Sequence, residues 1–126
     1  MTTGALAAVA ERYLETMVAH DFAAMAQCLA EDVVRVGPYG DTYTPREPYV
    51  AMLSRLMPSL PGYSMTVGRV VEIPDAGVVV VELTEVVEVD GRPLVTPEAL
   101  VFDMNDDERI ARITIYIQTL PGPATA

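Results

Sequence analysis

The sequence predicts an α+β domain in which helices pack on one face of a curved antiparallel sheet. Helical periodicity is confined to the first half of the chain, and four long extended segments follow it. An Asp-Gly dipeptide at residues 90–91 marks a hairpin between two of these segments. The length of 126 residues suits one domain of ordinary size. We place this domain at residues 4–120 and expect residues 121–126 to form a flexible tail.

Two helices are expected early in the chain. The first covers about residues 5–19, because apolar residues recur there at intervals of three and four: Leu6, Val9, Ala10, Tyr13, Leu14 and Met17. His20 and Asp21 interrupt this pattern, and Asp21 is a suitable N-cap for a second, shorter helix. The apolar side of the second helix comprises Phe22, Met25, Ala26 and Leu29.

A third helix is expected from Pro45 to about residues 57–58, after a short strand at residues 33–36 and a turn at residues 37–41. Thr44 supplies an N-cap, Pro45 a proline at the first helical position, and Glu47 a glutamate at the third. Together these residues predict a capping box.

The extended segments cover residues 63–73, 78–90, 94–104 and 110–120. In the last of them Ile113, Ile115 and Ile117 alternate with more polar residues, so the isoleucine side is expected to meet the helices. The outer face of the sheet is less polar than an exposed face should be, since it carries Val80, Val86, Val95, Ala99, Val101 and Tyr116. Exposed apolar surface of this kind marks a partner surface, and we therefore expect a homodimer through the outer face.

The Asp90-Gly91 dipeptide predicts the register of the central hairpin. A two-residue type I′ turn needs positive φ at both positions, which Asp-Gly tolerates, so Val89 should lie opposite Arg92. Counting back gives the pairs Val87 with Leu94, Glu85 with Thr96, Leu83 with Glu98, Val81 with Leu100, and Val79 with Phe102. Pro93 and Pro97 then occupy non-hydrogen-bonded positions, where no backbone N–H is required.

Glu85 is the most informative side chain of this hairpin, because the rest of its strand face is apolar: Val79, Val81, Leu83, Val87 and Val89. Glu98 is its diagonal neighbour, with α-carbons roughly 7–8 Å apart. Desolvation and the second carboxyl group both favour the neutral form of Glu85, so we expect it to donate or accept a proton in an apolar cavity. The alternatives are a buried acid satisfied by Tyr13, Thr96 or water, or a register slip that places it outside.

Composition disfavours several classes of partner. A formal charge of −10 with eight basic residues argues against nucleic acid and anionic membranes, which need Lys and Arg to neutralise phosphates. No apolar run approaches the roughly 18–20 residues of a membrane span. A lone Cys28, one histidine and no glycine-rich phosphate loop predict no metal and no cofactor. Without a disulfide or a basic secretory leader, the expected location is the cytoplasm.

Four short segments of the first half carry a family resemblance: residues 11–14 (Glu-Arg-Tyr-Leu), 19–22 (Ala-His-Asp-Phe), 29–33 (Leu-Ala-Glu-Asp-Val) and 37–40 (Gly-Pro-Tyr-Gly). The chain resembles, over about residues 5–120, the nuclear transport factor 2-like superfamily, which includes ketosteroid isomerases, SnoaL-like polyketide cyclases and limonene epoxide hydrolases. The resemblance implies a cone-shaped, cystatin-like α+β roll. In such a roll three N-terminal helices pack on the concave face of a strongly bent antiparallel sheet and close a deep apolar pocket.

The resemblance transfers the catalytic patterns of this group only in part. In the isomerase pattern it implies the tyrosine oxyanion donor at Tyr13, but the general-base aspartate falls at Gly37 and the protonated oxyanion-hole aspartate at Leu100. In the epoxide hydrolase pattern the strand aspartate corresponds to Glu85. The arginine two residues before it is absent, and the partner aspartate of the last strand falls at Ile115.

The sequence leaves three classes of function open. The leading hypothesis is a small enzyme that binds an apolar ring-containing molecule and performs one proton-transfer reaction: isomerisation, aldol-type cyclisation, dehydration or epoxide opening. Glu85 would be the general acid/base, Tyr13 would polarise a substrate oxygen, and Glu98 would tune the acid. The ligand-binding residues would be Tyr39, Tyr43, Leu53, Leu83, Leu100, Phe102, Ile113, Ile115 and Ile117. The alternatives are a non-catalytic binding protein for a hydrophobic metabolite and a protein-interaction module with a filled cavity.

Overall fold

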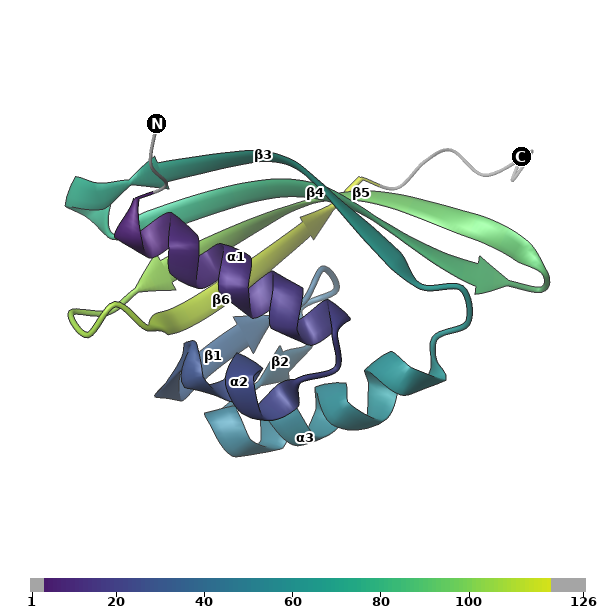
Figure 1. The fold of residues 1–126 in the computed structure, drawn as a ribbon, viewed down its shortest axis with the longest axis horizontal. Helices are drawn as coiled ribbons and strands as arrows, with labels where there is room; N and C mark the ends of the chain where they lie inside the picture. The colour runs from purple at the N-terminus through teal and green to yellow at the C-terminus, as the bar shows by residue number, and fades with distance from the viewer. Residues whose placement is uncertain (1–3, 119–126) are drawn as a thin grey trace.

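The computed structural model describes residues 4–118, which form an α+β fold with three α-helices on one face of a six-stranded sheet (Figure 1). The helices are α1 (Ala5–Val18), α2 (Phe22–Gln27) and α3 (Arg46–Leu56), with 3₁₀ turns at Met57–Ser59 and Pro74–Ala76. The strands are β1 (Leu29–Val36), β2 (Thr42–Tyr43), β3 (Ser64–Ile73), β4 (Val78–Val89), β5 (Arg92–Met104) and β6 (Ile110–Ile117). The predicted tail at residues 121–126, and the last two residues of the predicted domain, lie outside the described residues.

The sheet is mixed, with the strand order β2-β1-β6-β5-β4-β3. The four long strands β3 to β6 pair antiparallel in chain order, as predicted. β1 pairs in parallel with β6, a contact between distant segments that no local pattern specifies. β1 is also longer than the predicted residues 33–36, because Leu29 begins this strand opposite Ile110 and does not belong to the second helix. The short strand β2 was not predicted, and it pairs with β1 across the turn at residues 37–41.

The central hairpin has the predicted register at every pair. Asp90 and Gly91 have φ values of 53° and 76°, both positive, as a type I′ turn requires. On the other side of β4, the pairing with β3 shifts register around Gly68, between Val67 and Arg69. A bulge of this kind bends a strand, and the long strands curve over the helices in Figure 1.

The predicted helices are present, with one correction at a cap. α1 buries Ala7, Ala10, Tyr13, Leu14 and Met17 against the sheet. Asp21 is the N-cap of α2, and its carboxylate accepts a hydrogen bond of 3.2 Å from the backbone N–H of Ala24. The capping box predicted for α3 is wrong, because Pro45 itself takes the extended N-cap conformation and no side chain caps the helix. α3 begins one residue later than predicted, which leaves Thr44 too early in the chain to act as the cap.

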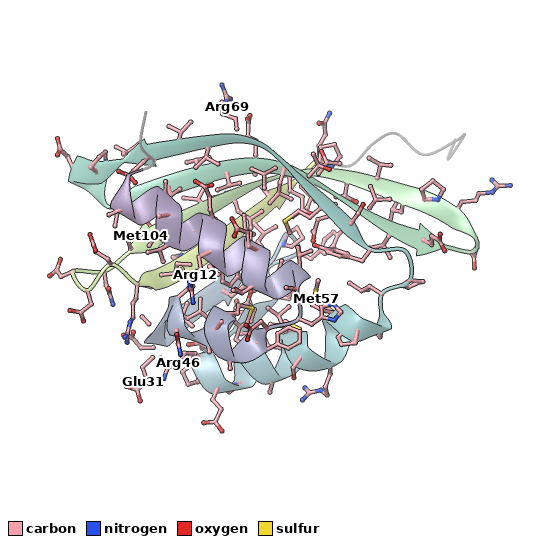
Figure 2. All side chains as sticks on the ribbon, in the orientation of Figure 1. Arg12, Glu31, Arg46, Met57, Arg69 and Met104 are labelled. Carbon is pink, nitrogen blue, oxygen red and sulfur yellow. The ribbon has the colours of Figure 1, made fainter. Side chains whose placement is uncertain are left out.

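The core lies between the helices and the concave face of the sheet. Its largest fully buried side chains include Tyr13, Tyr49, Phe102, Leu14, Met25, Leu29, Ile110 and Ile113. Arg69 projects from the opposite face, where its Nε lies 2.9 Å from a carboxylate oxygen of Glu82 (Figure 2). None of the helices between residues 4 and 118 combines the length and apolarity needed to cross a bilayer.

Candidate functional site

A cavity of about 200 Å³ lies between the helices and the inner face of the sheet. Alternate residues of two neighbouring strands form one wall, since they point to the same face: Leu83, Glu85 and Val87 of β4, and Leu94, Thr96, Glu98 and Leu100 of β5. The helical side contributes Tyr13, Met17, Tyr49, Leu53, Leu56 and Met57, and the lining is completed by Arg35, Leu60, Tyr63, Met65 and Ile115. Most of this surface is apolar, so its few polar groups decide what the cavity can do chemically.

Two of these polar groups are the carboxyl groups of Glu85 and Glu98, which the hairpin register brings together on the inner face. The Tyr63 hydroxyl donates a hydrogen bond to Oε2 of Glu85. Burial, a hydrogen bond with Glu85 and repulsion by the Glu85 charge raise the pKa of Glu98 to about 9, whereas the positive charge of Arg35 has a smaller, lowering effect. Near neutral pH, Glu98 therefore keeps its proton beside the Glu85 carboxylate.

Tyr13 and Tyr49 form a second polar group in the cavity. Tyr13 comes from α1 and Tyr49 from α3, and their hydroxyl groups share a hydrogen bond. Burial raises the pKa of both tyrosines, so both keep their protons at neutral pH. The Tyr13 ring is held edge-on against Phe102, with the ring centres 5.7 Å apart. Because the shared hydrogen bond uses one of the two hydroxyl protons, the other can be donated to an oxygen atom in the cavity.

Arg35 is the cation of the lining. Its Nη1 lies 2.6 Å from Oδ2 of Asp41, and this hydrogen bond lowers the pKa of Asp41. Its guanidinium carbon lies 5.9 Å from the centre of the Tyr43 ring. The Nε atom of Arg35 is buried and has no hydrogen-bond partner among residues 4–118. A buried N–H without a partner is unfavourable, so a hydrogen-bond acceptor placed beside this atom would be stabilising.

The structure brings only part of the predicted site together. The predicted residues that line the cavity are Tyr13, Glu85, Glu98, Leu53, Leu83, Leu100 and Ile115. Phe102 and Ile113 do not line it, because α1 covers this part of the sheet and both side chains are fully buried in the core. Ile117 borders depressions outside the cavity. Tyr39 is 84% exposed, and Tyr43 packs near Arg35, so neither predicted contact lies on the lining.

Sequence reasoning missed three polar residues of the lining. Arg35 follows the buried Val33 by two residues in a strand, which places both on one face. Tyr49 precedes the buried Leu53 by four residues in α3, which is one helical turn. These spacings could have identified Arg35 and Tyr49, whereas Tyr63 precedes β3 in a loop and has no periodic signal.

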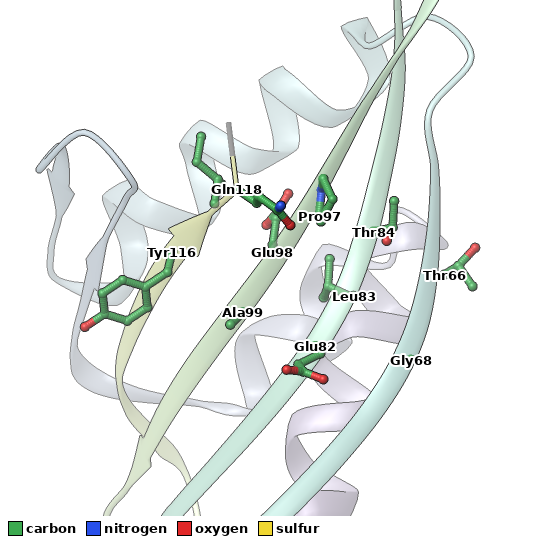
Figure 3. A pocket seen from close by; sticks show the side chains of 11 residues that line it. Thr66, Gly68, Glu82, Leu83, Thr84, Pro97, Glu98, Ala99, Tyr116 and Gln118 are labelled. Carbon is green, nitrogen blue, oxygen red and sulfur yellow. The ribbon is translucent and has the colours of Figure 1, made fainter. Parts of the chain in front are cut away.

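A larger and shallower depression of about 520 Å³ lies on the outer face of the sheet (Figure 3). Thr66, Glu82 and Tyr116 are among its lining residues. Glu98 also borders it, next to Pro97 in Figure 3, and is thus shared by the inner cavity and the outer depression.

Comparisons with known proteins agree with this architecture. The sequence model described as "SnoaL-like domain" matches residues 10–113. An LEH-like epoxide hydrolase from M. tuberculosis superposes with a TM-score of 0.78 at 18% identity, covering 90% of this chain and 83% of the other. A protein from Shewanella putrefaciens CN-32, provisionally assigned as a SnoaL-like polyketide cyclase, gives a TM-score of 0.78 at 12% identity, covering 92% and 91% of the two chains.

A third solved structure has no assigned function. It is a protein with a cystatin-like fold from Methylobium petroleophilum PM1, with a TM-score of 0.80 at 16% identity, and the alignment covers 98% of this chain and 82% of that one. No curated protein matches the sequence. At these identities the structural likeness is evidence for a shared fold only.

Proposed function

Since the chain belongs to the SnoaL-like domain family, we propose that it is a small enzyme that performs a cofactor-free proton transfer on an apolar cyclic molecule. The observation that carries this proposal is the pair of carboxyl groups, Glu85 and Glu98, on the lining of a mostly apolar cavity. Two carboxyl groups in different protonation states supply an acid and a base within one site. The possible reactions are isomerisation, cyclisation, dehydration and epoxide opening, each of which is accelerated by general acid–base catalysis.

The roles follow from the surroundings of each side chain. Glu85, held by the Tyr63 hydroxyl, removes a proton from a substrate carbon. Glu98, whose pKa of about 9 keeps it protonated, delivers its proton to a second position of the substrate. In an isomerisation, transfer of the acquired proton from Glu85 to Glu98 restores the pair without net gain or loss. Tyr13, backed by Tyr49, polarises a substrate oxygen. The sequence alone predicts Glu85 as the general acid/base and Glu98 as the group that tunes it.

Deuterium exchange tests the proposal before the substrate is known. The protein is incubated in D₂O with a panel of cyclic ketones, enones and epoxides, and mass spectrometry records deuterium uptake or conversion. Wild-type protein should label or convert at least one member, and Glu85→Gln should abolish this. Glu31→Gln, at an exposed position of β1, is the matched control and should retain it. Unchanged turnover in folded Glu85→Gln protein would remove Glu85 from the mechanism.

A non-catalytic binding protein for a hydrophobic metabolite is the second candidate. It is favoured by Gly37, Leu100 and Ile115, which stand where the resemblance implies catalytic acids in related enzymes. This candidate requires that native mass spectrometry finds a retained small molecule while no member of the panel is labelled or converted. A protein-interaction module is the third candidate, and it requires a partner in place of a small ligand.

We further propose a cytoplasmic homodimer that forms through the outer face of the sheet. The support is the exposed apolar surface on that side, where Val71, Val95 and Tyr116 are 41%, 42% and 59% exposed. Burying such residues is the main driving force of most protein association. Light scattering coupled to size-exclusion chromatography should give twice the monomer mass. Tyr116→Glu should reduce that mass to the monomer value, and a monomeric wild type would contradict this proposal.

A further inference from the structure

Arg35 and its neighbours provide hydrogen-bond donors at one part of the cavity. Arg35 lies opposite Ile113 of β6 in the sheet, and its side chain is only 15% exposed. Of its three nitrogen atoms, Nη1 donates to Asp41, whereas Nε is the buried side-chain polar atom without a partner among residues 4–118. The hydroxyl pair of Tyr13 and Tyr49 lines the same cavity. Arginine and tyrosine donors thus border one space.

The turn after β1 is shaped to hold this arginine. A backbone hydrogen bond of 2.7 Å from Gly37 N–H to the Asp41 carbonyl folds the turn and returns the Asp41 carboxylate to Arg35. A Cβ atom at residue 37 would lie 2.6 Å from Nη1 of Arg35 and would also collide with the Asp41 carboxylate. Glycine at this position therefore leaves the space that the Arg35 and Asp41 ion pair occupies. The resemblance implies a catalytic acid at residue 37, but here Gly37 makes room for the ion pair of Arg35 and Asp41.

The charge balance limits the kind of oxygen that can bind there. Asp41 already neutralises the positive charge of Arg35, and the Glu85 carboxylate lines the same cavity. A ligand carboxylate would add an uncompensated negative charge to a site poor in water, which is costly. A neutral carbonyl oxygen accepts the Nε–H hydrogen bond without that cost. The hydrocarbon part of such a ligand meets Met17, Leu53 and the other apolar lining residues.

We propose that Arg35 is a substrate-binding residue whose Nε–H donates a hydrogen bond to a neutral carbonyl oxygen of the ligand. The inference rests on the proposed function, because it takes the cavity to be the substrate site. It deepens that proposal by naming the functional group that the substrate carries, an aldehyde or ketone carbonyl on an apolar ring, and the residue that selects it. Arg35 is a lining residue of the cavity that Glu85 and Glu98 also line, so a ligand held by this arginine would lie near both carboxyl groups.

Nuclear magnetic resonance of the arginine side chains tests the inference without any assay of turnover. All eight basic residues are arginine, so a ¹⁵N-labelled sample gives a small set of Nε–Hε signals, and the Arg35 signal is the one that Arg35→Met removes. The probes are cyclohexanone, its hydrocarbon analogue methylenecyclohexane, and cyclohexanecarboxylate. Cyclohexanone should shift the Arg35 signal in wild-type protein, and methylenecyclohexane should not. Cyclohexanecarboxylate should bind at least about tenfold more weakly than the ketone.

Variants then separate this inference from the proposed function. Arg35→Met should weaken cyclohexanone binding about 10- to 100-fold, the range for losing a hydrogen bond to a charged donor, and should leave methylenecyclohexane binding unchanged. Arg55→Met, at an exposed position of α3, is the matched control and should change neither affinity. If cyclohexanone and methylenecyclohexane bind equally well and the Arg35 signal does not shift, the inference is overturned. The cavity would then still be a ligand-binding site. Binding of neither ring would also overturn the inference, whereas the proposed function falls only if no member of the deuterium-exchange panel is labelled or converted.

Discussion

Replacing Glu98 by glutamine should make the protein more stable above pH 5. The raised pKa of Glu98 means that the folded protein holds this proton up to about pH 9, whereas the unfolded chain releases it near the ordinary value of 4.5. Between these values the folded state binds more protons than the unfolded state, so the free energy of unfolding falls as the pH rises. Glutamine resembles protonated Glu98 in shape and can donate to Glu85, but it does not ionise.

The size of the effect follows from the separation of the two pKa values. One pKa unit corresponds to about 1.4 kcal/mol, so at pH 7 the distance from 4.5 sets an upper limit of about 3 kcal/mol. Glu98 is only partly buried, so solvent screens its charge. We therefore expect Glu98→Gln to raise the free energy of unfolding by about 1–3 kcal/mol at pH 7 and by little at pH 5.

Urea denaturation of wild type and Glu98→Gln at several pH values between 5 and 9 measures this difference. Glu31→Gln, which replaces an exposed carboxylate by the same chemistry, controls for the change in net charge and should give a nearly constant difference. The difference in free energy of unfolding between Glu98→Gln and wild type should grow with pH. A difference that is constant between pH 5 and pH 8, or a variant that is less stable than wild type at pH 8, would refute the buried carboxyl pair.

Three further substitutions test other parts of the structure by urea denaturation. Tyr63→Phe removes the hydrogen bond to Glu85 and should lower the free energy of unfolding by about 1–2 kcal/mol. No measurable change would mean that the Tyr63 hydroxyl does not bond to Glu85 when the protein is in solution. Gly37→Ala should lower the free energy of unfolding by about 1–3 kcal/mol, because the added Cβ meets the ion pair of Arg35 and Asp41. The same contact should shift the Arg35 Nε–Hε signal in the nuclear magnetic resonance spectrum, and an unmoved signal would contradict that geometry. Phe102→Ala should lower the free energy of unfolding by about 3–5 kcal/mol, as expected for a fully buried aromatic ring. A loss near 1 kcal/mol would indicate that Phe102 lines the cavity, as the sequence predicts.

The central hairpin shows how far local chemistry reaches. The Asp-Gly turn requires positive φ at two consecutive residues, and this requirement defines the pairing of every residue behind it. Because side chains alternate along a strand, the same count places Glu85 and Glu98 on one face. The carboxyl pair could therefore be predicted from the sequence, whereas the raised pKa of Glu98 depends mainly on its burial, which no local pattern gives.

Local signals were weaker where neighbouring elements compete for a residue. Thr44 has the chemistry of an N-cap, but Pro45 takes that position and α3 begins one residue later. Leu29 fits the apolar side of a short helix equally well, yet its pairing with Ile110 places it in β1. Phe102 lies on the predicted inner face, and only the position of α1 across the sheet removes it from the cavity.

The sequence by itself determined the α+β class, the helix and strand periodicities and the carboxyl pair, because each depends on residues that are close in the chain or joined by one tight turn. Only the tertiary structure brought Arg35, Tyr49 and Tyr63 to the same cavity. These residues come from a strand, a helix and a loop, and their approach depends on the parallel pairing of β1 with β6 and on the packing of α3. Such contacts join segments far apart in the chain, and their geometry is set by the packing of the whole core, which no local pattern encodes.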